Sequence, residues 1–275
     1  MNEVMNLQKK IGFIGTGNMA DAMIKGLVNN FQDIYKKMYV SDKALDKAEE
    51  MAKLYDLNLC QSNVEVVKNT DIIILAVKPN IYRYVLEEIK GYVTNNHILI
   101  SIAAGISIDF IQGYFDYPIK IVRTMPNTPA FVGEGMTAVT ANSEVKHEEL
   151  ETVLNIFNSI GKADIIDEKL MDMIPAVSGS SPAYVYMFIE ALADGAVLQG
   201  MTRDKAYQYA AQAVMGAAKM VLESGKHPGE LKDQVCSPGG TTIEAVYTLE
   251  KNHFRGIIIE AMEDCTTKTK KLTGK

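Results

Sequence analysis

The stretch 235–246, VCSPGGTTIEAV, contains a turn that has no ionisable side chain from Ser237 to Thr242. Thr241 and Glu244 have the spacing of a helix capping box, so the two glycines before them are expected at a helix N-terminus. Free backbone N–H groups at the positive end of a helix dipole bind anions. The dipole contributes only ~0.3–1 kcal/mol at an exposed end, whereas each amide hydrogen bond to a carboxylate adds roughly 1.5–3 kcal/mol.

This turn is therefore predicted to bind a small carboxylate without the help of an arginine. The alternative is an ordinary capped helix start, in which Glu244 satisfies the same backbone donors. The residues assigned to the substrate are Ser237, Gly239, Gly240, Thr241 and Thr242.

A second motif lies near the N-terminus, in IGFIGTGNMADAM. Gly15 permits a tight turn after a strand, and Gly17 leaves room for a pyrophosphate to approach the backbone at the start of a helix. Ala20 allows the helix to pack closely on the strand. The motif is weak alone, but here it opens a strand–helix–strand unit, which is the context that dinucleotide binding requires.

The end of the next strand bears on which dinucleotide is used. Asp42 could bind the ribose hydroxyls of NAD, although it lies further along the chain than is usual, whereas Lys43 could attract the extra phosphate of NADP. The two side chains favour opposite cofactors, so the sequence predicts NADPH or NADH without choosing.

Further polar or glycine-bearing segments follow later strands, at residues 76–80 (AVKPN), 101–105 (SIAAG) and 123–130 (RTMPNTPA). Ligands of open α/β sheets bind outside the carboxyl ends of the strands. Any one of these segments could be a plain strand-to-helix connection, but three at the same edge favour a cofactor cleft.

The side chains that could donate a proton limit which reduction the protein can catalyse. Reduction of a ketone develops an alkoxide, which a His or Lys normally protonates. None of His97, His147, His227 and His253 is obviously placed for that, and each is expected at the surface or in packing. A cyclic imine can arrive with its nitrogen already protonated, so the missing acid favours an imine, with Thr242 orienting the nitrogen.

Composition narrows the class of protein. The chain has 275 residues, 47% of them hydrophobic, which suits two globular domains at roughly 100–200 residues each. A net charge of −6 argues against nucleic acid or an anionic membrane as a partner. Three scattered cysteines and a head without an apolar signal segment predict a cytoplasmic protein with no metal site of the usual spacing.

The elements that must position these motifs alternate in the first part of the chain. Strands are predicted at 11–14, 38–41, 71–77, 98–102 and 119–122, with helices at 18–28 and 43–55. Such alternation predicts a parallel sheet covered on both faces. We therefore expect an α/β, Rossmann-type doubly wound domain over residues 1–166.

From residue 167 to 275 the pattern predicts an all-α domain. Ser181 and Pro182 form a helix-start signal, and the residues that follow, 183–201, are apolar nearly all round. Glu190 and Asp194 argue against a membrane span. Because about a hundred residues offer little interior, we expect these helices to be buried against another copy of the chain.

Taken in order, the motifs GFIGTGNMA, AVKP, SIAAG, MPNTPA, SGSSPAYVYMFIEALADGAVLQGM, AAQAVMGAAKMV, HPGELKDQVCSPGGTTIEAV and EAMEDC closely resemble the pyrroline-5-carboxylate reductase family. The resemblance runs from about residue 11 to residue 272, and its second-domain motifs are the more specific ones. It implies reduction of the cyclic imine L-1-pyrroline-5-carboxylate to L-proline with NADPH or NADH, the last step of proline biosynthesis. It also implies a helical domain that pairs with its partner in a homodimer or larger homo-oligomer.

The resemblance also assigns site residues. Gly240 and Thr241 would present amides to the substrate carboxylate, and Thr242 would be the catalytic residue that hydrogen-bonds the ring nitrogen. The residues that would bind the dinucleotide are Gly12, Phe13, Ile14, Gly15, Thr16, Gly17, Asn18, Met19, Ser41, Asp42, Ala76, Val77, Lys78, Pro79, Ser101, Ala103, Ala104, Gly105 and Asn127.

Two other functions remain as alternatives. A β-hydroxyacid dehydrogenase shares the plan but carries a catalytic Lys on the first long helix of its second domain, and residues 178–201 contain no Lys. A sensor that binds NAD(P) without catalysis would differ in showing no turnover.

Overall fold

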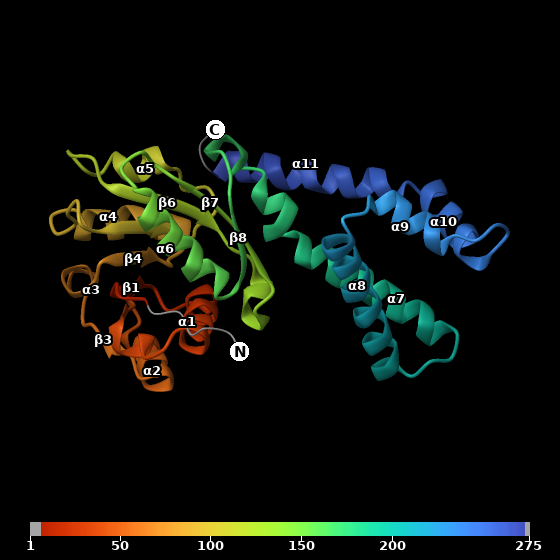
Figure 1. Cartoon of the computed structure of the whole chain (residues 1–275), viewed down its shortest axis with the longest axis horizontal. Helices are drawn as coiled ribbons and strands as arrows, with labels where there is room; N and C mark the ends of the chain where they lie inside the picture. The colour runs from red at the N-terminus through yellow and green to blue at the C-terminus, as the bar shows by residue number, and fades with distance from the viewer. Residues whose placement is uncertain (1–6, 273–275) are drawn as a thin grey trace. The chain divides into compact units, whose positions relative to one another are not determined.

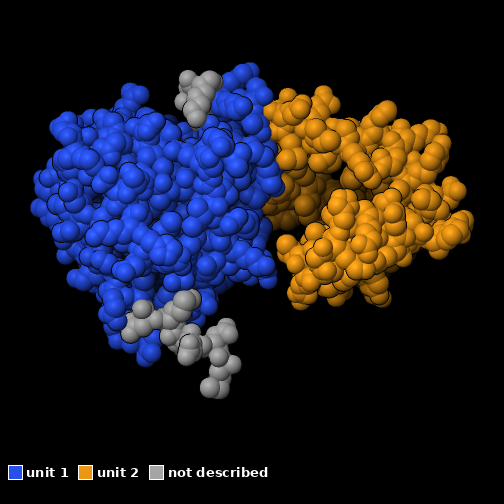
Figure 2. All heavy atoms as spheres, turned by 45° about the horizontal axis from the view of Figure 1, so that its top comes forward, with its two compact units in different colours: residues 1–179, 266–275 blue, residues 180–265 orange. Residues whose placement is uncertain are grey.

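The computed structural model describes residues 7–272, and residues 1–6 and 273–275 lie outside the described range. The prediction that the N-terminal segment is not a signal segment rests partly on residues 1–6. The chain forms two compact units, Met1–Gly179 with Thr266–Lys275, and Ser180–Cys265 (Figure 2). The division after residue 179 falls later than the predicted one after residue 166. The reason is that the connecting segment packs on the sheet unit, where Arg123 pairs with Asp172 and Asn127 donates to the carbonyl of Ser178.

The sheet unit is built on an eight-stranded sheet of order β3-β2-β1-β4-β5-β6-β7-β8 (Figure 1). Its strands are β1 Ile11–Ile14, β2 Met38–Ser41, β3 Asn58–Leu59, β4 Ile72–Leu75, β5 Ile98–Ser101, β6 Lys120–Met125, β7 Gly135–Ala141 and β8 Gly161–Ile165. All five predicted strands are present, two of them with the predicted bounds. The short β3 and the pair β7 and β8 were not predicted.

The predicted parallel sheet is present with one exception, because β6 and β7 pair antiparallel. Only residues 126–134 connect these two strands, and a parallel crossover needs a dozen or more residues. The connection from β7 to β8 contains a helix, and those two strands are parallel again.

Helices cover both faces of this sheet, as predicted. They are α1 Asn18–Asn30, α2 Leu45–Tyr55, α3 Asn63–Asn69, α4 Tyr82–Ile89, α5 Ile108–Gln112 and α6 His147–Asn158. Alternate residues of β4 belong to different cores: Ile72 and Ile74 pack with residues of α1 and α6, and Ile73 and Leu75 pack with residues of α3 and α4. A continuous apolar strand of this kind is typical of a sheet buried on both sides.

The second unit is helical, with α7 Ser181–Leu198, α8 Arg203–Ser224, α9 Pro228–Val235, α10 Thr241–Lys251 and α11 Phe254–Leu272, the last turns of α11 belonging to the sheet unit. A π-helical turn, Pro175–Gly179, precedes α7. Because that turn is already helical, Ser180 is the N-cap and α7 begins at Ser181, one residue earlier than predicted, with Pro182 as the second helical residue.

The helical unit leaves most of its apolar surface uncovered within one chain. In the described part of α7 and α8 the only buried side chains are Ala193, Ala206 and Ala210. Larger apolar side chains are open to solvent, among them Met187 at 69% and Leu198 at 89% exposure. No helix within residues 7–272 is long and apolar enough to cross a membrane.

Candidate functional site

A cleft of about 570 Å³ lies at the carboxyl ends of β1, β2 and β4. Its lining comes from the glycine turn after β1, the end of β2, the start of α3, the turn after β4 and one face of α4. The lining residues are Ile14, Gly15, Gly17, Ser41, Asp42, Lys43, Leu45, Gln61, Ser62, Asn63, Ala76, Val77, Lys78, Ile81, Tyr84, Val85 and Glu88.

The glycine turn has the shape that a dinucleotide needs. Gly15 has a φ of +101°, and a Cβ there would lie 2.7 Å from the carbonyl oxygen of Ala76, so only glycine fits. A Cβ on Gly17 would meet nothing within 4 Å, so its Cα faces open space at the N-terminus of α1. A pyrophosphate can therefore approach the start of this helix closely.

The amides of the turn divide into two groups. Those of Gly15 and Thr16 already donate within the protein, to the carbonyl of Ser41 at 2.8 Å and to Asp42 Oδ2 at 2.8 Å. For the amides of Gly17, Asn18 and Met19 there is no acceptor among residues 7–272. These three N–H groups at the helix start are the donors left for a phosphate.

Asp42 lies in the cleft, but its carboxylate serves the fold. Its Oδ2 accepts from the amide and hydroxyl of Thr16, at 2.8 and 3.1 Å, and its Oδ1 accepts from the amide of Ala44 at 2.9 Å. A carboxylate has about four acceptor positions, so this one has little capacity left for two ribose hydroxyls. Asp42 fixes the glycine turn to the end of β2.

The far side of the cleft is formed by residues of α3 and α4 and by Ile81 in the turn before α4, none of which the sequence motifs predicted. Ser41 Oγ donates to Asn63 Oδ1 at 2.8 Å, and Asn63 Nδ2 donates to Glu88 Oε2 at 2.7 Å, which links β2, α3 and α4. On α4 and the turn before it, Ile81, Tyr84, Val85 and Glu88 line the cleft. Their i, i+3, i+4, i+7 spacing directly after a strand-end turn is a signal that could have found them.

Several residues assigned to the dinucleotide do not line this cleft. Phe13 is fully buried, and a Cβ on Gly12 would lie 2.3 Å from Val66 Cγ1, so both belong to the packing of β1. Asn127 is also occupied by the protein: its Oδ1 accepts from the amide of Met136 at 2.9 Å and its Nδ2 donates to the carbonyl of Ser178 at 3.0 Å.

Ser101 is fully buried, and its Oγ lies 2.9 Å from the hydroxyl of Tyr82. The turn that follows it is more accessible, since Ala104 is exposed and Gly105 has a φ of +80°. Pro79, Ala103, Ala104 and Gly105 lie at the carboxyl ends of β4 and β5, where the sequence predicted them, and their contact with a nicotinamide stays a prediction.

The turn before α10 is a second arrangement of free backbone donors. Pro238 followed by Gly239, with a φ of +67°, is typical of a type II turn, which the amide of Gly240 closes by donating to the carbonyl of Ser237 at 3.0 Å. Gly240 is the N-cap of α10, and no side chain caps this helix. The predicted capping box is therefore wrong, because Thr241 is already the first helical residue.

This geometry changes which amides of the turn are available. The Gly240 N–H, assigned to the substrate, is engaged inside the turn. The N–H groups of Thr241 and Thr242 have no acceptor within residues 7–272, and neither does the half-buried hydroxyl of Thr242. Two amides and one hydroxyl at a helix N-terminus suit a carboxylate next to a polar ring atom.

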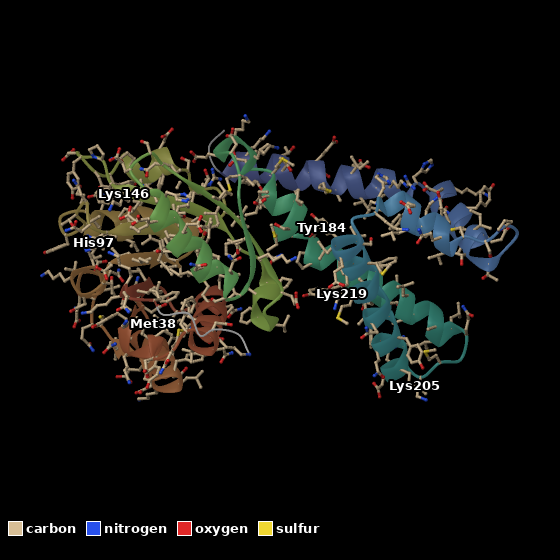
Figure 3. The ribbon with its side chains drawn as sticks, in the orientation of Figure 1. Met38, His97, Lys146, Tyr184, Lys205 and Lys219 are labelled. Carbon is tan, nitrogen blue, oxygen red and sulfur yellow. The ribbon has the colours of Figure 1, made fainter. Side chains whose placement is uncertain are left out.

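Two of the four histidines, His97 and His227, serve local structure. His97, labelled in Figure 3, accepts the Thr94 amide on Nδ1 at 2.8 Å, and burial lowers its pKa. His227 caps α9 by accepting from the amide of Gly229 at 3.0 Å. None of the four histidines lines the described cleft. Helix α7 has no lysine, and Lys205 and Lys219 lie on α8 (Figure 3).

Comparison with known proteins gives consistent matches for both parts of the chain. Residues 168–272 match the family model described as pyrroline-5-carboxylate reductase dimerisation, and residues 10–105 match the model described as NADP oxidoreductase, coenzyme F420-dependent. A pyrroline-5-carboxylate reductase from Escherichia coli is 50% identical over 267 residues, which is 97% of this chain and 99% of that protein.

Solved structures agree with these matches. A pyrroline-5-carboxylate reductase from Coxiella burnetii superposes with a TM-score of 0.90 at 34% identity, covering 97% of this chain and 99% of the other. The Plasmodium falciparum pyrroline carboxylate reductase with NADP bound superposes with a TM-score of 0.85 at 36% identity, covering 97% and 98%.

Proposed function

The chain belongs to the pyrroline-5-carboxylate reductase family, and we propose that it reduces L-1-pyrroline-5-carboxylate to L-proline with NADPH or NADH, the last step of proline biosynthesis. The observation that carries this proposal is the 50% identity to the Escherichia coli reductase over nearly the whole of both chains. The cleft and the turn before α10 supply the two kinds of binding that this reaction requires.

The part of the cleft at the N-terminus of α1 has room and hydrogen-bond donors for the phosphates of a dinucleotide. The open space at Gly17 and the unused amides of Gly17, Asn18 and Met19 would hold the pyrophosphate. Lys43 and Lys78 line the same cleft and form no ion pair within the described residues. When bound, the reduced dinucleotide supplies the hydride.

The turn before α10 would hold the substrate. The amides of Thr241 and Thr242 would bind its carboxylate, and the Thr242 hydroxyl would orient its ring nitrogen. The C=N bond gains a hydride at carbon while the nitrogen keeps its proton, so no side-chain acid is needed at that atom. This accounts for a substrate turn, Ser237 to Thr242, without a histidine or lysine.

The direct test mixes purified protein with NADPH and pyrroline-5-carboxylate and follows the loss of absorbance of the reduced nicotinamide, with proline as the product to be identified. Turnover to proline is expected. Binding of NADPH without turnover would instead support the sensor.

A first prediction concerns Thr242. Thr242→Val is expected to lower kcat by about tenfold, roughly the loss of one hydrogen bond, while the affinity for NADPH stays unchanged. Steady-state kinetics and a fluorescence titration with NADPH measure the two quantities. Thr248→Val is the matched control, because the Thr248 hydroxyl donates to the carbonyl of Glu244 within the same helix. Equal activity of Thr242→Val and the wild-type protein would remove Thr242 from the mechanism.

A second prediction concerns the choice of cofactor, for which we propose NADPH. The Asp42 carboxylate already accepts hydrogen bonds from Thr16 and Ala44, so it has little capacity left to bind the ribose hydroxyls of NADH. Lys43, the next residue, lines the cleft and could bind the extra phosphate of NADPH. Lys43→Ala is expected to raise KM for NADPH by about tenfold and to leave KM for NADH nearly unchanged.

Steady-state rates with each cofactor test this choice. Lys47→Ala is the control, since Lys47 is an exposed residue of α2 outside the cleft lining. A wild-type preference for NADH, or an equal effect of Lys43→Ala on both cofactors, would contradict the role of Lys43.

We also propose a cytoplasmic location. Cys60, Cys236 and Cys265 are free thiols, as is usual for a protein in a reducing compartment. Cell fractionation with an antibody against the chain tests this, and recovery from a secreted fraction would contradict it.

A further inference from the structure

One buried tyrosine is not used by the proposed mechanism, although it lies directly beneath the cofactor turns. Tyr82 is the first residue of α4 and is fully buried in the core between α3, α4 and the sheet. Its hydroxyl donates to the carbonyl of Leu75 at 2.7 Å and lies 2.9 Å from Ser101 Oγ. Leu75 and Ser101 are the last residues of β4 and β5.

The direction of these hydrogen bonds follows from the groups involved. A carbonyl only accepts, so the single hydroxyl proton of Tyr82 goes to Leu75, and Ser101 must donate its own proton to the tyrosine oxygen. Thr124 Oγ1 on β6 donates to the carbonyl of Ser101 at 2.9 Å. Side chains thus cross-link three adjacent strand ends, and such chains strengthen one another.

The cross-link lies at the carboxyl ends of β4 and β5, where the pairing of these strands ends. Leu75 and Ser101 are paired in register and are the final pair of the β4–β5 ladder. Beyond them the chain enters the segments 76–79 and 102–105, and the family resemblance assigns residues 76–79 and 103–105 to the dinucleotide. Burial raises the pKa of Tyr82, so the hydroxyl keeps its proton at neutral pH and the bond persists there.

We propose that Tyr82 is a positioning residue for the dinucleotide: its hydroxyl, acting with Ser101, fixes the spacing of the turns after β4 and β5 and thereby sets cofactor affinity. This inference rests on the proposed function. It also explains why Ser101 is buried at a position assigned to cofactor binding, since Ser101 acts through Tyr82 and not on the ligand.

The test compares Tyr82→Phe with the wild-type protein. Without the hydroxyl, part of the free protein is expected to hold the turns after β4 and β5 at a spacing that does not bind NADPH. The apparent affinity for NADPH then falls in proportion to the fraction of protein that can still bind it. The Kd for NADPH, titrated by its own fluorescence, and KM for NADPH are expected to rise about tenfold, the loss of roughly one hydrogen bond. The kcat at saturating NADPH and KM for pyrroline-5-carboxylate should stay within about twofold, because the turn before α10 is unchanged.

Tyr117→Phe is the matched control. The Tyr117 hydroxyl also donates to a main-chain carbonyl of the sheet unit, that of Val93, but it precedes β6 and so lies at the opposite end of the parallel strands from the cleft. This variant should lower the unfolding temperature without changing the Kd for NADPH. If Tyr82→Phe likewise changes only the unfolding temperature, its role is purely structural and the inference is overturned.

Ser101→Ala is a second, independent test of the proposal, and it replaces Tyr82→Phe if that variant does not fold. It should weaken NADPH binding to the same degree as Tyr82→Phe, and the double variant should be no worse than either single one. Additive losses would show that the two hydroxyls act separately, against the inference. Absence of turnover in the wild-type protein would instead refute the proposed function, so the two failures are distinguishable.

Discussion

At the scale of single residues, the fold uses several side chains that the sequence assigns to a ligand. Asp42 accepts from Thr16 and Ala44, Asn127 joins Met136 to Ser178, and Ser101 bonds to Tyr82. A motif indicates that a polar group is needed at a position. Whether its partner is the protein or a ligand depends on what packs beside it.

Thr137 shows the opposite situation, a buried polar atom without any partner. Its Oγ1 is the one buried side-chain oxygen or nitrogen of the described residues that makes no hydrogen bond. Thr137→Val keeps the shape and removes the desolvated hydroxyl, so we expect the free energy of unfolding to increase by about 1 kcal/mol.

Urea denaturation at one fixed protein concentration measures this change. Thr124→Val is the matched control, since the Thr124 hydroxyl donates to the carbonyl of Ser101 and its loss should lower stability. A destabilised Thr137→Val would mean that the Thr137 hydroxyl forms a stabilising hydrogen bond in solution, against this prediction.

At the scale of the element, a type II turn decides which amides at the start of α10 are open. The sequence predicted the helix start and the anion turn, but it placed the N-cap at Thr241, one residue too late, and predicted a capping box that does not form. Because the Gly240 amide closes the turn on Ser237, the donors left for a carboxylate are Thr241 and Thr242. This distinction needs the backbone angles and cannot be read from residue types.

Gly240→Val tests the role of this turn. A Cβ at residue 240 would lie 2.3 Å from Ser237 Oγ and 3.2 Å from the Ser237 carbonyl oxygen, so the Ser237 hydroxyl must rotate away and the backbone of the turn must yield slightly. We expect KM for pyrroline-5-carboxylate to rise by about tenfold or more while KM for NADPH is unchanged. Gly91→Ala, where a Cβ would meet nothing within 4 Å, is the control. An unchanged KM for the imine would argue against the anion turn.

At the scale of the whole molecule, the helical unit indicates assembly. Its match to a dimerisation model and its uncovered apolar helices agree that the protein is a homo-oligomer. The buried side chains of α7 and α8 within the described chain are three alanines, which are too small to form a core alone. We propose a dimer or a larger ring of dimers as the stoichiometry.

Met187→Glu tests this assembly. Met187 on α7 is 69% exposed in one chain, and a carboxylate there should be tolerated by a monomer but not inside an interface. We expect light scattering at micromolar concentration to give a smaller mass for the variant than for the wild-type protein. Leu54→Glu is the control, because Leu54 is 71% exposed on α2 of the sheet unit and should leave the mass unchanged. A monomeric wild-type protein would contradict the interpretation of the apolar helices.

The sequence by itself determined the two-part plan, the strands of the parallel core, the glycine turn and the turn before α10, because each follows from local periodicity and from backbone freedom that only glycine has. Tertiary structure alone decided that the fold itself uses Asp42, Ser101 and Asn127, and that Asn63 joins Ser41 to Glu88 at the wall of the cleft. These features depend on hydrogen bonds between segments far apart in the chain, such as Asn63 with Glu88 and Tyr82 with Ser101. No local pattern specifies such partners, since they are chosen by how the packed elements meet.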